Sequence, residues 1–363
     1  MTDLREALDR LLEAVPPKRL AESVQRLITD YRSGRPADEP LLRNMVDATA
    51  YAAYRMPATH AAVAAVLRQI SISPESVLDV GGGSGAATWA ALAEFPTIGT
   101  ATVLDQVTEA LKLGSRMLPT AQWQEWHLGE PLSPADLIMV SYVLGELTEE
   151  AQHQLVDDAS ATARQAVVIV EPGTPLGYQR ILDARQRLIA AGWTVAAPCP
   201  HQQQCGMTGK DWCHFSARVN RSALHRRLKD AELGYEDEKF SYVAVTRQAQ
   251  GTRGRVVRHP AFRKGLVTLQ VCDQDTTVGP KLVSKREGPT YKAARDAEWG
   301  DPWPVLIGHR RGTPEARPLE DQRPGLRGVA GQVWSAAKEA TQDSEEFQLM
   351  VSSFVDHDLM SSM

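Results

Sequence analysis

A run of glycine and serine, Gly81-Gly82-Gly83-Ser84-Gly85, joins two apolar segments of different pattern. The residues before it, 76–80, read as a short β-strand, and the alanine-rich residues after it, 86–95, read as a helix. Glycine lets the backbone turn sharply and lets a ligand approach closely. A helix that begins at such a turn presents unpaired N–H groups to a carboxylate or a phosphate. The run therefore predicts a strand–turn–helix unit with a ligand site at the turn.

The alternation of strand and helix continues along the chain. Strands are expected at 76–80, 100–105, 123–127, 136–142, 166–171, 193–196 and 240–246, with helices at 86–95, 107–117, 149–163 and 178–191. Strands that alternate with helices form a parallel, doubly wound sheet with helices on both faces. We therefore predict an α/β, Rossmann-like domain over residues 71–250.

The segments on either side of this domain have other patterns. Residues 1–70 are expected to form an N-terminal helical region, in which helices over 41–53 and 59–70 are separated at Pro57. Residues 251–311 favour short strands with no helix between them and are predicted to form a small β module. Residues 312–363 are rich in Pro, Glu, Asp, Gln and Ser and are expected to be a partly disordered tail.

Two acidic residues narrow the choice of ligand at the glycine turn. Asp79 lies on the first strand, and Asp105 closes the second, where an acid can accept hydrogen bonds from ribose hydroxyls. An acid followed by Gly-x-Gly-x-Gly resembles the signature of S-adenosylmethionine (SAM) dependent methyltransferases, whereas an NAD loop would need glycine where Ala86 stands. The predicted SAM-binding residues are Asp79, Gly81, Gly82, Gly83, Gly85 and Asp105. NAD or FAD binding and a vestigial loop are the alternatives.

The end of the fourth expected strand is the place to look for catalytic residues. It carries Ser141, Tyr142 and Glu146, which are the candidate catalytic residues. The Asn/Asp-Pro-Pro-aromatic motif that clamps a flipped base is absent from this segment. No cysteine lies here or at the end of the fifth strand, so a cysteine nucleophile has no candidate. The sequence leaves the reaction chemistry open.

Four cysteines form a second pattern that suggests chemistry. Cys199, Cys205 and Cys213 lie within fifteen residues of one another, and Cys272 stands alone on an expected strand. Four thiolates satisfy either tetrahedral zinc or a 4Fe–4S cluster. The wide spacing, six and eight residues, is more typical of iron–sulfur than of zinc knuckles. Two nearby histidines, at 201 and 214, keep zinc as the alternative.

The charge of the chain is unevenly distributed. The formal net charge is −5, yet residues 251–311 contain twelve Lys or Arg and only six Asp or Glu. A basic module on an acidic body indicates a directed contact with a polyanion. The tentative RNA-binding residues are Arg253, Arg255, Arg258, Lys281, Lys285, Arg286, Lys292 and Arg295.

Composition excludes some locations for the protein. No run of about 18 apolar residues occurs, so no membrane association is predicted. The first residues are charged and lack the apolar core of a signal peptide. Four cysteines in such a chain are more consistent with reduced thiols or metal ligands than with disulfides. We expect a protein of the bacterial cytoplasm.

Several motifs together resemble one family, the methyltransferase-like assembly factors of the small ribosomal subunit. In mitochondria this family is known as methyltransferase-like protein seventeen, and it is also called the Rsm-twenty-two family. The motifs are 51–59 (YAAYRMPAT), 78–85 (LDVGGGSG), 141–147 (SYVLGEL), 170–175 (VEPGTP), 199–201 (CPH), 211–215 (DWCHF), 284–286 (SKR), 291–292 (YK) and 299–301 (WGD). They extend over roughly residues 40–305. The first forty residues and the tail lie outside the match.

The resemblance implies a class I SAM-dependent methyltransferase fold with an iron–sulfur insertion at about 197–238. It implies a 4Fe–4S cluster on Cys199, Cys205, Cys213 and Cys272, and association with the rRNA of the small ribosomal subunit; no DNA partner is expected. Because the first three cysteines follow a parallel strand, we expect the cluster on the same edge of the sheet as the SAM site. Cys272 would then tie the basic module to the body as a structural staple.

Three functions remain open at this stage. The first is a SAM-binding protein that methylates small-subunit rRNA or acts in assembly of the subunit. The second is a non-catalytic assembly and RNA-binding factor on the same fold. The third, weaker hypothesis is a small-molecule methyltransferase.

Overall fold

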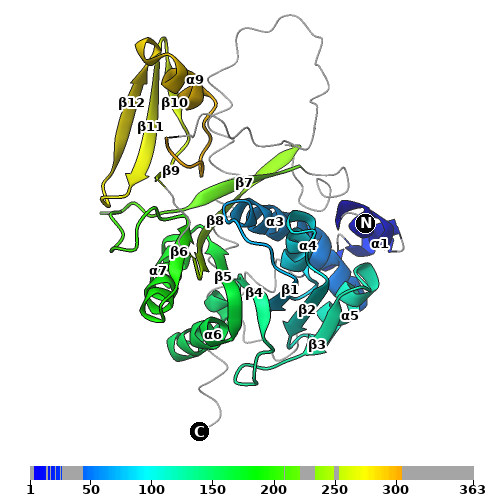
Figure 1. The fold of residues 1–363 in the computed structure, drawn as a ribbon. Helices are drawn as coiled ribbons and strands as arrows, with labels where there is room; N and C mark the ends of the chain where they lie inside the picture. The colour runs from blue at the N-terminus through cyan, green and yellow to red at the C-terminus, as the bar shows by residue number, and fades with distance from the viewer. Residues whose placement is uncertain are drawn as a thin grey trace, which may run out of the picture.

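The computed structural model describes residues 4–13, 15–16, 18–20, 22–24, 26, 44–207, 209–220, 234–248 and 253–304. Figure 1 shows an α/β body, a helical segment against it and a smaller β-sheet at one side. The predicted tail, 312–363, and part of the predicted cysteine insertion, 221–233, lie outside the described residues.

The body is built on an eight-stranded sheet. Its strands are β1 (Ser76–Val80), β2 (Thr100–Asp105), β3 (Gln122–Glu125), β4 (Ala135–Ser141), β5 (Ala163–Pro172), β6 (Thr194–Ala197), β7 (Phe215–Asn220) and β8 (Tyr235–Thr246). The order is β3-β2-β1-β4-β5-β8-β6, and β7 pairs with the other end of β8. This order, with one reversed strand before the last, is the class I SAM-dependent methyltransferase fold.

One expectation about the sheet is wrong. Strand β8 runs antiparallel to both β5 and β6, so the sheet is mixed and not wholly parallel. Strand β7, which precedes β8 in the chain, pairs with it in antiparallel orientation. Strand and helix alternation had predicted parallel strands, but β8 is antiparallel to each of its three partners, and an antiparallel pair needs no crossover connection. The predicted insertion therefore contributes a strand to the sheet itself.

Alternate residues of the strands pack against helices on opposite faces. On one face, Val77 and Met139 contact α3 (Met45–Leu67), α4 (Ala86–Glu94) and α5 (Thr108–Met117). On the other face, Leu78 and Ile138 contact α6 (Glu149–Thr162) and α7 (Pro175–Ala190). Burial on both faces explains why these strands read as continuous apolar runs.

The N-terminal helical region is partly as expected. Helix α1 (Leu4–Glu13) buries Leu4, Leu8 and Leu12, the positions that its leucine spacing predicts. The break expected at Pro57 is wrong, because α3 continues through that proline from Met45 to Leu67. The helix packs against α4, β7 and β8, and this burial offsets the hydrogen bond that the proline removes. Among the described residues, no helix is long and apolar enough to cross a membrane.

The second sheet confirms that a small β module follows the body. It comprises β9 (Gly254–Val256), β10 (Ala261–Arg263), β11 (Leu266–Asp273) and β12 (Val278–Ser284), all antiparallel. A short 3₁₀ turn, η2 (Lys285–Glu287), leads to α9 (Pro289–Arg295), which the sequence analysis had not expected. Ala294 of this helix and Trp303 pack on Val267 and Val271. The opposite face of β11 carries Cys272 toward the body.

Candidate functional site

The glycine turn has the geometry that the sequence predicts. Gly81, Gly83 and Gly85 all have positive φ angles, 67°, 55° and 86°. Gly85 stands at the N-cap of α4 in the left-handed region, where residues with a Cβ are strained. The turn is closed by a hydrogen bond from the Gly85 N–H to the carbonyl of Gly82, 2.7 Å.

At Gly82 and Gly85, neighbouring side chains also leave no room for a Cβ atom. A Cβ on Gly82 would lie 2.6–2.7 Å from the Asp79 carboxylate and from Val103. A Cβ on Gly85 would lie 2.6 Å from the Trp123 ring, which also covers Gly114. Trp123 is a residue that sequence reasoning did not single out. It covers the helix side of the turn.

Asp79 is buried directly beneath the turn with one oxygen free to bind. Its Oδ2 accepts hydrogen bonds from the Thr88 N–H, 3.0 Å, and the Thr88 hydroxyl, 2.7 Å. Its Oδ1 is buried and has no hydrogen-bond partner among the described residues. Burial and the charge of Asp105 together raise the pKa of Asp79 to about 6, against the two hydrogen bonds from Thr88 that lower it. A cationic ligand at Oδ1 would stabilise the ionised carboxylate.

Asp105 holds the turn from the next strand. Its two oxygens accept hydrogen bonds from the N–H of Gly83, 2.7 Å, and of Val107, 2.8 Å. Burial raises the pKa of this carboxyl, and the backbone hydrogen bonds oppose the rise. The structure thus brings both predicted acids to one turn. Each carboxylate oxygen keeps lone pairs that can accept a hydroxyl of a ribose.

Two further acids lie beside this pair. Glu171, at the end of β5, accepts a hydrogen bond from the Leu144 N–H, 3.0 Å, and lies 3.7 Å from the Arg180 guanidinium. Burial raises its pKa to about 7 against the effect of Arg180. Glu146 is an exposed residue, but desolvation of its carboxyl and the charges of Asp105 and Glu171 raise its pKa to about 7. Glu146 therefore lies near the predicted cofactor acids, as expected of a pocket residue.

The other two tentative catalytic residues differ from each other. The Ser141 hydroxyl is buried and has no hydrogen-bond partner among the described residues. Tyr142 has a positive φ, 62°, which is rare for a bulky residue. Its hydroxyl donates to Glu238, 3.0 Å, and the Arg55 guanidinium binds the same carboxylate oxygen, 3.2 Å. Burial and Glu238 raise the pKa of Tyr142, so its hydroxyl remains protonated and fixed.

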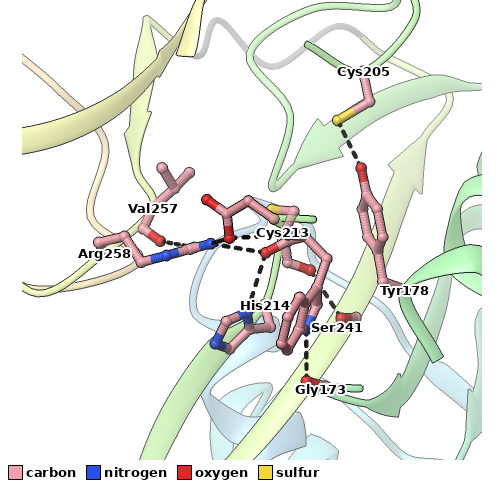
Figure 2. Close-up of polar contacts among 10 residues, drawn as sticks. Gly173, Tyr178, Cys205, Cys213, His214, Ser241, Val257 and Arg258 are labelled. Carbon is pink, nitrogen blue, oxygen red and sulfur yellow. Dashed lines mark hydrogen bonds and ion pairs between the residues drawn. The ribbon is translucent and has the colours of Figure 1, made fainter. Parts of the chain in front are cut away.

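The four cysteines converge at the same edge of the sheet. Cys199 follows β6, which runs parallel to β5 because both are antiparallel to β8. The Tyr178 hydroxyl, on α7, donates to the Cys205 sulfur at 3.1 Å, and Ser241 of β8 donates to the Cys213 carbonyl (Figure 2). Cys272, from the β module, lies with its sulfur 3.8 Å from Nε2 of His201. This placement confirms what the strand topology predicts.

Electrostatic effects show that the four thiols share one region. Burial raises the pKa of Cys213, and the charges of the other three thiols raise it further. Burial also raises the pKa of Cys199, and that of Cys272 to about 12. Thiols in such surroundings become thiolates only when a cation binds.

The spacing of these donors bears on the kind of metal centre that they could hold. Among the described residues, no three His, Cys, Asp or Glu side chains stand close enough to share a single metal ion. Four thiols are nevertheless the ligand set of a cubane cluster, whose core is larger than one ion and holds its ligands farther apart. Nδ1 of His201 and of His214 lies within hydrogen-bond distance of a backbone carbonyl, which leaves Nε2 of each imidazole as the nitrogen that could bind a metal. The four free thiols fit a four-thiolate cluster in their donor chemistry.

Two of the tentative RNA-binding arginines have a different role, and that prediction is wrong for them. Arg255 is only 2% exposed and donates to the carbonyls of Pro198, 2.9 Å, and Gly300, 2.8 Å, and to Gln69. Arg258 binds Asp211 and the Trp212 carbonyl (Figure 2). The pattern of apolar and charged residues in this segment did not indicate that these two guanidinium groups point toward the protein interior. Both bind backbone next to a cysteine and so support the thiol site.

The other basic candidates lie on the surface. Arg253, Lys285, Arg286, Lys292 and Arg295 are exposed, four of them on η2 and α9. Lys281 is exposed but forms an ion pair with Asp273, 2.9 Å. The basic surface of the module is therefore centred on η2 and α9.

Comparison with known proteins places the chain in a family. Residues 45–304 match the family described as "Mitochondrial small ribosomal subunit Rsm22". The chain is 27% identical over 301 residues to the human protein "Ribosome assembly protein METTL17, mitochondrial", covering 74% of this chain and 63% of the human protein. It is 22% identical over 340 residues to "Rsm22-cox11 tandem protein 2, mitochondrial" of Schizosaccharomyces pombe, covering 74% and 45%. The chain thus spans less than two thirds of the length of these relatives.

Solved structures with partial similarity include two methyltransferases. Human N-acetylserotonin methyltransferase in complex with SAM is 15% identical, with a TM-score of 0.38, covering 64% of this chain and 67% of that protein. An O-methyltransferase family protein from Burkholderia thailandensis is 12% identical, with a TM-score of 0.41, covering 63% and 72%. Our fold assignment rests on the strand order and not on these overlaps. The family match, in contrast, covers well over half of the sequence, and this chain belongs to the Rsm22 family.

Proposed function

We propose that this chain is a SAM-binding, methyltransferase-like factor that acts in assembly of the small ribosomal subunit and carries a 4Fe–4S cluster. The observation that carries the proposal is the convergence of the glycine turn and four thiols at one sheet edge, with a basic module joined to the body beside them. The printed names of the relatives refer to ribosome assembly and the small ribosomal subunit, and this supports the choice of partner. The bacterial cytoplasm remains our prediction for its location.

The residues of the chain have distinct roles in this proposal. Asp79 would bind the cationic amino group of SAM through its free Oδ1, and Asp105 would bind the ribose. Cys199, Cys205, Cys213 and Cys272 would hold the cluster, which supplies a rigid cross-link between the body and the module. Zinc in the same site is the alternative, but a single ion would require the donors to move closer together than they stand among the described residues.

One experiment tests the proposal as a whole. The full chain is purified anaerobically, its iron, sulfide and zinc are quantified, and SAM binding is measured by calorimetry. Binding to immature small subunits is then measured at several salt concentrations. A cluster, SAM binding and salt-dependent association are expected. A chain that binds SAM but no ribosomal RNA at low salt would favour a small-molecule methyltransferase instead.

Reversing two charges on the basic surface is expected to weaken RNA binding without unfolding the module. Lys285 and Arg286 are exposed on η2. Removing one phosphate contact lowers the slope of log affinity against log salt by about 0.9, so K285E/R286E should lower it by about 2 if both residues contact phosphates. The control is K112E, on α5 of the body, where the slope should be unchanged. Equal slopes for wild type and K285E/R286E would place the RNA elsewhere.

Methyl transfer is a second candidate function, and Glu146 is the residue that favours it. A carboxyl with a pKa of about 7 near the cofactor acids is matched to general-base chemistry at neutral pH. If the chain transfers methyl groups, E146Q should lower the rate by about 100-fold or more while SAM affinity changes little. Transfer of labelled methyl from SAM to immature subunits measures this. No transfer by the wild type would leave the non-catalytic assembly role.

A further inference from the structure

Arg185 is a buried cation beside the four thiols. It lies on α7 and is 1% exposed. Its Nη2 donates to the carbonyls of His201 and Gln203, both at 2.8 Å, in the loop between Cys199 and Cys205. Its Nε and Nη1 are buried and have no hydrogen-bond partner among the described residues. The one acceptor that the electrostatics of the site places at this guanidinium is the Cys199 thiol, whose pKa a hydrogen bond with Arg185 lowers.

The buried guanidinium of Arg185 needs a nearby anion to offset its charge. A guanidinium keeps its proton in proteins, so it cannot escape burial by becoming neutral. A buried, unpaired charge costs several kcal/mol of stability. Within the described ranges, Arg185 makes no ion pair with Asp or Glu. The groups that respond to its charge include Cys199 and Cys272, whose pKa values it lowers against the effect of burial.

The thiol site supplies an anion when it is loaded. Four thiolates around either a zinc ion or a 4Fe–4S core leave a net negative charge, because the ligands carry more charge than the metal core. Cluster sulfur atoms also accept hydrogen bonds, which together with nearby charge set the reduction potential. The loaded thiol site would therefore place an anion next to the N–H donors of Arg185.

We propose that Arg185 is the buried counter-cation of the four-cysteine centre, with its Nε and Nη1 donating to the anionic ligand held there. This inference rests on the proposed centre and assigns a positioning residue to it. Tyr178 has a similar role at another ligand, because its hydroxyl donates to the Cys205 sulfur at 3.1 Å. Arg185 also fixes the loop between two ligands, so it organises the site before loading.

The variants R185M and R185K separate charge from packing. Both alter the side chain, but only R185K keeps the positive charge. The matched control is R187M, two residues along the same helix, where the guanidinium is largely at the surface and pairs with Asp157. Melting of the metal-free variants establishes that each one folds. The measurements are the rate of metal release to a chelator and, for a cluster, its reduction potential.

R185M is expected to release metal about tenfold faster than wild type, with R185K between them and R187M unchanged. In an iron–sulfur protein the potential of R185M should shift to more negative values, because a removed positive charge disfavours the added electron, whereas R185K should stay near wild type. Wild-type release and potential in R185M would overturn the inference. Equal losses in R185M and R185K with an unchanged potential would assign Arg185 a packing role only. A wild-type chain that binds neither iron–sulfur nor zinc contradicts the proposed centre itself.

Discussion

Replacing Cys272 with serine is expected to empty the metal centre and to loosen the β module from the body. Cys272 is the only one of the four cysteines outside the segment 199–213, and on β11 it is the cross-strand neighbour of Arg255 on β9. A serine hydroxyl is a poor ligand for soft metals, so the affinity of the centre should fall by at least about tenfold. A bound group stabilises the folded state by mass action, by about 2.7 kcal/mol at 100 times its dissociation constant.

The measurements for C272S are metal content, visible absorption and thermal melting of the full chain. The variant should contain little metal and melt several degrees below loaded wild type. Metal-free wild type and metal-free C272S should melt together, because the serine itself fits where the thiol was. T268S, on the same face of β11, is the matched control and should keep both metal and melting temperature. If C272S matched loaded wild type in both respects, the staple hypothesis would be wrong.

Arg255 provides a second attachment of the β module to the body, and this attachment does not depend on a bound metal. Arg255 donates to Pro198 and Gln69 of the body and to Gly300 of the module. These contacts hold the module in place around Cys199 even when no metal is bound. We therefore expect C272S to lower stability without releasing the module as a separate domain.

The sequence predicted the structure correctly where a local pattern determines it. The strand before Gly81 and the helix after Gly85 were predicted because their apolar periodicity and the turn between them agree. The position of the cysteines at the cofactor edge followed from topology, since all parallel strands end at one edge. Asp79 and Asp105 came together for the same reason.

The parts that were not predicted depend on contacts distant in sequence. Pro57 stays within a helix because that helix is packed against the sheet, which a local propensity cannot anticipate. Arg255 reads as a surface cation, yet its partners are 57 and 186 residues away. Arg185 did leave a signal, because it follows Ile181 by one helical turn on the apolar face of α7. A charge at a buried position of a helix is a pattern worth weighing as a site residue.

Replacing Asp79 with asparagine is expected to abolish most SAM binding while the fold is kept. Oδ1 of Asp79 is buried beside the turn without a hydrogen-bond partner among the described residues, and the asparagine removes the charge of the carboxylate. A hydrogen bond to a charged group is worth about 1.5–3 kcal/mol, so affinity should fall roughly 10- to 100-fold. Asparagine can still accept a hydrogen bond from Thr88 through its carbonyl, which supports folding. Calorimetry with SAM measures the loss.

The matched control is D136N, at the opposite edge of the same sheet. Asp136 also accepts hydrogen bonds from backbone N–H groups, those of Glu75 and Ser76, but it lies far from the turn along β4. D136N should bind SAM as wild type does. If D79N and D136N bound SAM equally well, the free oxygen of Asp79 would not be the acceptor that we assign.

The pH dependence of binding gives the same assignment a second test. The pKa of Asp79 in the ligand-free chain is raised to about 6, so folding with an ionised Asp79 costs stability above that pH. A cationic ligand removes this cost, and SAM should therefore raise the melting temperature more at pH 7.5 than at pH 5.5. Below pH 6 each unit should weaken binding by up to about tenfold through this group, whereas above pH 7 its contribution is constant. The pH dependence of SAM binding that remains in D79N would come from Glu146 and Glu171, whose pKa values are near 7. An unchanged pH profile in D79N would show that those two acids, and not Asp79, bind the cation.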